Sequence, residues 1–143
     1  FPFSKKVLDR ANTIEFSYVD LEAMPSFTIS LVQKQTLPNS FLVSDYITLN
    51  DCNPADEEYI RSNAAKLQRI NKILETANAH VGYRVRDEII FYMLNNKKSE
   101  LLDESVAFDN QIMQKILPRI QGSSDIIKTM LEELYKLCES VIW

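Results

Sequence analysis

Glycine is nearly absent from this chain of 143 residues, which contains only Gly82 and Gly122. A phosphate-cradling loop of the GxxxxGK[ST] type needs two closely spaced glycines, so the sequence excludes one. No run of β-branched residues ends in paired acids, so the acidic magnesium-binding motif that accompanies such a loop in nucleotide-hydrolysing enzymes is missing as well. We therefore expect this chain alone to hydrolyse no nucleotide. Because glycine is so scarce, we also expect each one to serve a particular backbone conformation.

Histidine and cysteine, which build metal sites and disulfide frameworks, are equally scarce, and acidic residues outnumber basic ones. There is one histidine, and the two cysteines, Cys52 and Cys138, lack CxxC spacing, so we predict no metal site. We expect two reduced structural thiols in a cytoplasmic protein. The net charge of -4 gives no basic excess for wrapping nucleic acid. No apolar run approaches the roughly 20 residues that span a bilayer, so we predict no membrane contact.

The N-terminal part has the pattern of a helix followed by a strand. The pattern over residues 4–11 predicts a short helix whose buried side carries Val7, Leu8 and Ala11. β-Favouring residues alternate over 13–19, which predicts one strand. A single strand cannot form a sheet, so it should pair with a segment upstream or later in the chain. Prolines interrupt residues 20–50, which is typical of an irregular linker or a small hairpin.

From residue 51 onward, apolar residues recur at helical spacing. Asn53, Pro54 and the acids after them are a strong helix start. Four amphipathic helices are predicted, over residues 53–79, 84–95, 104–117 and 124–140. Their predicted inward side chains include Val85, Ile89, Ile90, Met93, Val106, Ile112, Met113, Ile116, Met130, Leu131 and Leu134. The predicted fold class is therefore mainly α, a bundle of about four helices after a helix-strand remnant of an α/β core.

Several segments, taken in order, resemble the C-terminal part of an AAA+ ATPase. They are LDRA (residues 8–11), IEF (14–16), VGYRV (81–85), FDNQI (108–112) and KILPRIQG (115–122). The last of these runs makes the chain similar to the McrB-type group, the motors of methylcytosine-directed restriction systems. The resemblance covers most of the chain outside residues 20–50. It implies that residues 1–50 are the end of the core subdomain with a linker, and that 51–143 form the helical lid.

The resemblance also assigns roles to individual residues. Arg84 stands where the sensor-2 arginine of the family contacts the γ-phosphate, with Gly82 and Tyr83 in the same nucleotide-contacting turn. A guanidinium at a helix N-terminus suits this role, because planar donors and the helix dipole both favour phosphate oxygens. Arg10 matches the arginine finger that the family supplies to a neighbouring subunit. McrB-type motors usually carry several arginines just before the strand, where this chain has Asn12 and Thr13.

The cofactors and partners follow from the same resemblance. It implies ATP or GTP, with Mg²⁺ held by a core subdomain that this chain lacks. It further implies a ring of identical subunits, a nuclease subunit as partner, and DNA reached through the complex.

Simpler interpretations remain open beside this one. The chain could be a non-enzymatic helical module that binds a partner protein, with Arg84 a solvated surface residue. Arg10 could form a local ion pair with Asp9, and Asp87 and Glu88 have the pattern of a solvated helix face. A helix-turn-helix DNA binder is disfavoured, because the helix after residue 124 opens with an acid and offers DNA only two lysines.

Overall fold

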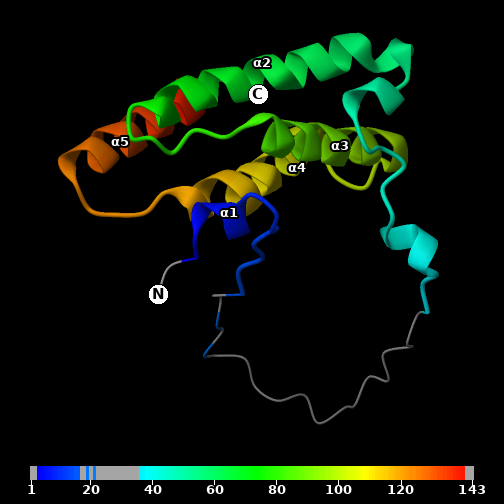
Figure 1. Ribbon diagram of the computed structural model, residues 1–143, viewed down its shortest axis with the longest axis horizontal. Helices are drawn as coiled ribbons and strands as arrows, with labels where there is room; N and C mark the ends of the chain where they lie inside the picture. Colours follow the sequence, from blue (N-terminus) through cyan, green and yellow to red (C-terminus); the bar gives the residue numbers. More distant parts are fainter. Residues whose placement is uncertain (1–2, 17–18, 20, 22–35, 141–143) are drawn as a thin grey trace.

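The computed structural model describes residues 3–16, 19, 21 and 36–140, and over these residues it is mainly helical, with no strand. The main helices are α2 (Glu57–Glu75), α3 (Tyr83–Ser99), α4 (Glu104–Gln111) and α5 (Asp125–Ser140). Figure 1 shows successive helices running in alternating directions. Helix α2 contacts α3 and α5, and α3 contacts α4. The predicted mainly α bundle is confirmed. None of the described helices is long and apolar enough to cross a membrane.

The core lies between these helices and is built from their apolar stripes. It consists of Leu67, Ile70, Leu74, Ala79, Val85, Ile89, Met93, Ala107, Phe108, Ile116, Met130 and Leu134. Burying any one of its larger side chains (Val, Leu, Ile, Met or Phe) stabilises the fold by about 1.5–3 kcal/mol. The predicted inward residues of α3 are all buried. In α4 the prediction of Val106 was wrong, because Ala107 and Phe108 face the core and Val106 is 46% exposed.

Helix α2 begins and ends through its own sequence signals. Asn53 Oδ1 accepts a hydrogen bond from Ala55 N at 3.0 Å, and the 3-10 turn η3 (Pro54–Asp56) leads into the helix. The helix ends at Glu75 rather than near residue 79, because Asn78 adopts a left-handed conformation with φ 53°. Ala79 N then donates to Leu74 O at 2.9 Å, which closes the turn. This turn starts the connection that leads to α3.

The predicted helix over 104–117 is interrupted before Pro118. Helix α4 gives way to the π-helical segment η4 (Ile112–Ile116) and then to the 3-10 turn η5 (Leu117–Arg119). Pro118 has no N–H to donate to the carbonyl of Gln114. Thr13 N donates to this carbonyl instead, at 3.2 Å. The wider π turn also changes which side chains face inward, so that Lys115 and Ile116 are buried while Met113, predicted inward, is 56% exposed.

The N-terminal segment docks onto this end of the bundle. Helix α1 (Lys5–Leu8) contacts η5 and inserts Leu8, which is 7% exposed, whereas Val7 points outward. The predicted strand is wrong for residues 13–16, which have no strand partner among the described residues. Thr13 bonds to a helix carbonyl, so Ile14 and Phe16 stay exposed. Residues 17 and 18 lie outside the described residues.

The predicted linker is irregular where the structure describes it. Residues 36–50 contain the 3-10 turn η1 (Asn39–Leu42) and the start of η2 (Leu49–Asp51), with no hairpin. The part of this predicted linker or hairpin over residues 22–35 lies outside the described residues. The division of the chain at residue 50 stays a prediction.

Candidate functional site

The start of α3 brings three of the predicted site residues together. Gly82 is the N-cap residue and is extended, with φ -95° and ψ -179°, and no side-chain hydrogen bond caps the helix. Tyr83 is 78% exposed, and the side chain of Arg84 is 61% exposed. The first turn contains no acid. Backbone N–H groups and the positive end of the helix dipole thus lie at an exposed helix start, and an exposed guanidinium stands in the same first turn; each of these features favours an anion.

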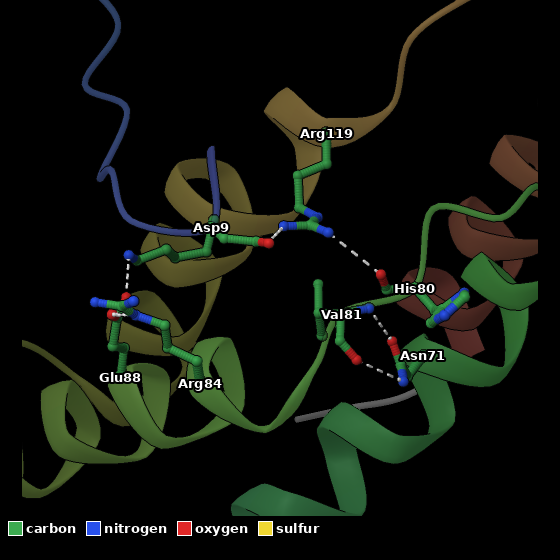
Figure 2. A network of polar contacts seen from close by, with 8 residues as sticks. Asp9, Asn71, His80, Val81, Arg84, Glu88 and Arg119 are labelled. Atoms are coloured by element: carbon green, nitrogen blue, oxygen red, sulfur yellow. Dashed lines mark hydrogen bonds and ion pairs between the residues drawn. The ribbon is translucent and has the colours of Figure 1, made fainter. Parts of the chain in front are cut away.

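Two other elements hold the turn that leads into α3 (Figure 2). From α2, Asn71 Oδ1 accepts from Val81 N at 2.7 Å, and Asn71 Nδ2 donates to Val81 O at 3.3 Å. From η5, Arg119 Nη2 donates to His80 O at 3.3 Å. Neither of these two side chains was predicted from the sequence. Because the turn is bonded from two sides, the bundle sets where the backbone of α3 begins, and with it the point from which the Arg84 side chain extends.

The two arginines of the first turns of α3 differ in what they contact. Arg86 pairs with Asp87 at 2.6 Å and lies over the ring of Tyr83, 4.8 Å from its centroid. Arg84 donates through Nε to Glu88 Oε1 at 3.2 Å. Among the described residues, no group bonds to the two terminal Nη nitrogens of Arg84. Arg84 is therefore the better placed of the two to bind a phosphate.

Two buried cations behind this surface were not predicted. Lys115 is 3% exposed and pairs with Glu88, and Arg119 is 6% exposed and pairs with Asp9. Burial lowers the pKa of the Arg119 guanidinium. The suggested Asp9–Arg10 ion pair is wrong, because Asp9 pairs with Arg119. The solvated-face interpretation is likewise wrong for Glu88, whose side chain is 31% exposed and bonds to a buried lysine.

One sequence signal could have identified these cations. Lys115 and Arg119 lie in a mainly apolar run, and neither has an acid three or four residues away. A cation without a local partner in an apolar run needs a partner elsewhere, because an isolated buried charge is strongly unfavourable.

Arg10 lies apart from the exposed start of α3, at a groove of about 1040 Å³. The groove also reaches Glu88, Lys98 and Lys115, and its lining includes the stacked rings of Tyr46 and Phe91, whose centroids are 5.6 Å apart. Arg10 is exposed and makes no ion pair with the described residues. The structure thus places Arg10 near the buried end of the Glu88 network, and Arg84 at its exposed end.

The described residues contain no group of three or more metal-ligating side chains that could hold a metal ion. Cys52 and Cys138 are free thiols. Burial is the main cause that raises the pKa of both thiols. The only histidine contributes its backbone carbonyl to the site.

Residues 28–141 match the model of a family described as a domain of unknown function, DUF8727. The chain belongs to the DUF8727 family. The matched region contains the whole α2–α5 bundle, including Arg84, Glu88, Lys115 and Arg119, whereas Arg10 precedes it. No curated protein and no solved structure matches the chain.

Proposed function

We propose that this chain forms the helical lid at the C-terminal end of an AAA+ nucleoside triphosphatase. The observation that carries the proposal is Arg84, exposed in the first turn of α3 after a helix start with no capping side chain and no acid. The two terminal Nη nitrogens, which no described group engages, suit two oxygens of a phosphate. Sequence resemblance supplies the family, and the geometry of α3 is what supports the role.

In this proposal each subdomain contributes a different part of the site. A core subdomain outside this chain binds ATP or GTP and holds Mg²⁺, and the lid closes over the nucleotide. Arg84 then contacts the γ-phosphate and stabilises the charge that develops during phosphoryl transfer. The open space around Gly82, where an added Cβ would meet nothing within 4 Å, lets the phosphate approach the backbone. Arg10 acts as the arginine finger for a neighbouring subunit in a ring.

The McrB-type resemblance extends the proposal to a biological context. Subunits assemble into a ring in the cytoplasm, a nuclease subunit binds to the ring, and DNA is the eventual target. Movement of the lid would couple hydrolysis to work on that target.

Nucleotide hydrolysis by the full-length protein that contains this chain tests the proposal. We expect Arg84→Ala to lower the rate with ATP or GTP by at least about tenfold. Arg84→Lys should restore only part of it, because an ammonium lacks the planar fork. The matched control is Arg61→Ala, which removes an exposed arginine from the first turns of α2. Unchanged hydrolysis by Arg84→Ala would rule the lid role out.

An exposed apolar face on α5 favours a second candidate, a helical module that binds a partner protein. Leu131, predicted inward but 42% exposed, and Tyr135, 64% exposed, line a groove of about 560 Å³. Exposed apolar patches of this kind mark protein contacts. In this second case Leu131→Glu would abolish a complex seen by size-exclusion chromatography, while Arg84→Ala would leave it intact.

A further inference from the structure

The carboxylate of Glu88 contacts two cations, the exposed Arg84 and the buried Lys115. Its Oε1 accepts from Arg84 Nε at 3.2 Å, and its Oε2 pairs with Nζ of Lys115. Figure 2 shows Arg84 and Glu88 side by side on α3. Each carboxylate oxygen therefore has its own cation, and the position of one cation constrains the contact with the other.

Lys115 is the fixed member of this trio. Its side chain is 3% exposed and lies on the π-helical segment η4, which turns both Lys115 and Ile116 inward. A buried ammonium is stable only beside an acceptor, so Glu88 is bound strongly from this side. The exposed Arg84–Glu88 contact is weak by comparison, as solvent-exposed pairs four residues apart usually are. Lys115 therefore sets the position of the carboxylate.

The first turns of α2 show an arginine–glutamate pair with no buried lysine. Arg61 donates to Glu57 Oε1 through both Nε at 2.9 Å and Nη2 at 2.7 Å, and both side chains are more than 60% exposed. In this pair the Glu57 carboxylate accepts a hydrogen bond from a terminal Nη nitrogen of Arg61. In the pair on α3, the Glu88 carboxylate accepts from Nε of Arg84 alone. The order of acid and arginine along the helix is reversed between the two pairs, so a substitution at Lys115 is needed to separate order from anchoring.

We propose that Lys115 is a positioning residue for Arg84. By holding the Glu88 carboxylate, Lys115 limits it to Nε of Arg84 and leaves both Nη nitrogens for a phosphate. Without Lys115 the carboxylate shifts toward the guanidinium and occupies an Nη nitrogen, as Glu57 does with Arg61. This inference rests on the proposed contact between Arg84 and a nucleotide phosphate.

A double-mutant cycle in the full-length protein measures the effect on nucleotide hydrolysis. We expect Lys115→Met to lower hydrolysis of ATP or GTP by about tenfold, as for the loss of one oriented charge-assisted hydrogen bond. In an Arg84→Ala background the same substitution should change the rate by less than about twofold, because its target is already gone. An equal loss in both backgrounds would show a merely structural effect and overturn the proposal, as would no loss at all.

Lys66→Met is the matched control. Lys66 is a partly buried lysine, 21% exposed, that like Lys115 pairs with a glutamate, here Glu104 at 2.9 Å, but Glu104 lies on α4 and does not bond to Arg84. We expect the rate of ATP or GTP hydrolysis by Lys66→Met to stay within about twofold of the parent rate. A loss equal to that of Lys115→Met would show that any buried lysine has this effect, and would overturn the proposal.

A structural readout separates this inference from the proposed function. In NMR spectra of the 143-residue chain, the Nε–H signal of Arg84 should move in Lys115→Met, while that of Arg61 stays in place as an internal control. If the Arg84 signal does not move, the positioning role fails whatever the activity. If it moves but Arg84→Ala hydrolyses normally, the proposed nucleotide contact fails instead, and with it the purpose assigned to Lys115. Should Lys115→Met lose its helical signal, Lys115→Gln takes its place in every measurement, because its shorter, uncharged side chain makes no ion pair with Glu88.

Discussion

The Asp9–Arg119 ion pair should respond unequally to the loss of its two partners. Arg119 is 5% exposed in its side chain, and its Nε is buried with no partner among the described residues, whereas Asp9 is 40% exposed. Asp9→Asn removes the countercharge and leaves the buried guanidinium with neutral acceptors alone, His80 O and the amide oxygen of the new side chain. Removing one partner of a fully buried pair costs about 3–5 kcal/mol, and the exposure of Asp9 reduces this to about 2 kcal/mol.

Arg119→Met should cost less, about 1 kcal/mol or below. Methionine keeps the apolar stem packed and removes both the buried charge and the Nε without a partner, while Asp9 is already half hydrated. The main loss is the hydrogen bond to His80 O, which is worth about 0.5–1.5 kcal/mol. In the double variant the two changes should be strongly non-additive, because the charge that Asp9→Asn leaves unpaired is no longer present.

Urea unfolding followed by the helical circular dichroism signal measures these differences from the midpoints. The expected order of stability is parent, then Arg119→Met, then Asp9→Asn, with the double variant within about 0.5 kcal/mol of Arg119→Met. If Arg119→Met costs more than Asp9→Asn, the ion pair contributes net stability and the reasoning from desolvation is wrong.

Three further predictions concern the bundle. Phe108→Ala, at a side chain 1% exposed, should lower the free energy of unfolding in urea by about 3–5 kcal/mol, and a loss equal to that of Tyr135→Ala on the surface would contradict the packing. Gly122→Ala should cost about 1 kcal/mol or more because its φ is +108°, whereas Gly82→Ala should be nearly neutral in urea; equal costs would contradict this difference. Burial raises the pKa of Tyr59, so its contribution to stability is fully present below the unfolded pKa of about 10 and is lost as pH rises through the folded pKa. Unfolding measured across alkaline pH should therefore decline less in Tyr59→Phe than in the parent, and an identical decline would count against it.

The sequence predicted the bundle because helical periodicity is a local signal. Four apolar stripes placed α2 to α5 with errors of a few residues at their ends. The misplaced helix ends have local backbone causes, which the spacing of apolar residues does not reveal. The left-handed Asn78 ends α2 early, and Pro118 breaks the last part of the third predicted helix into π and 3-10 turns.

The site was only half predictable for the same reason. The first turn of α3, with Gly82, Tyr83 and Arg84, follows from a turn signal and a family resemblance. Its supports, such as Asn71 and Arg119, bond across the fold to residues that no local pattern identifies. The scarcity of glycine was a correct guide at Gly122, where φ is positive, and a wrong one at Gly82, whose extended backbone suits any residue.

The proposed contact of Arg84 can be tested most directly by a structure of the full-length protein with a non-hydrolysable ATP or GTP analogue and Mg²⁺. The lid account predicts an Nη nitrogen of Arg84 about 3 Å from an oxygen of the γ-phosphate, with Nε still bonded to Glu88. A bound nucleotide with Arg84 turned to solvent, or the absence of any nucleotide site facing the start of α3, would contradict it.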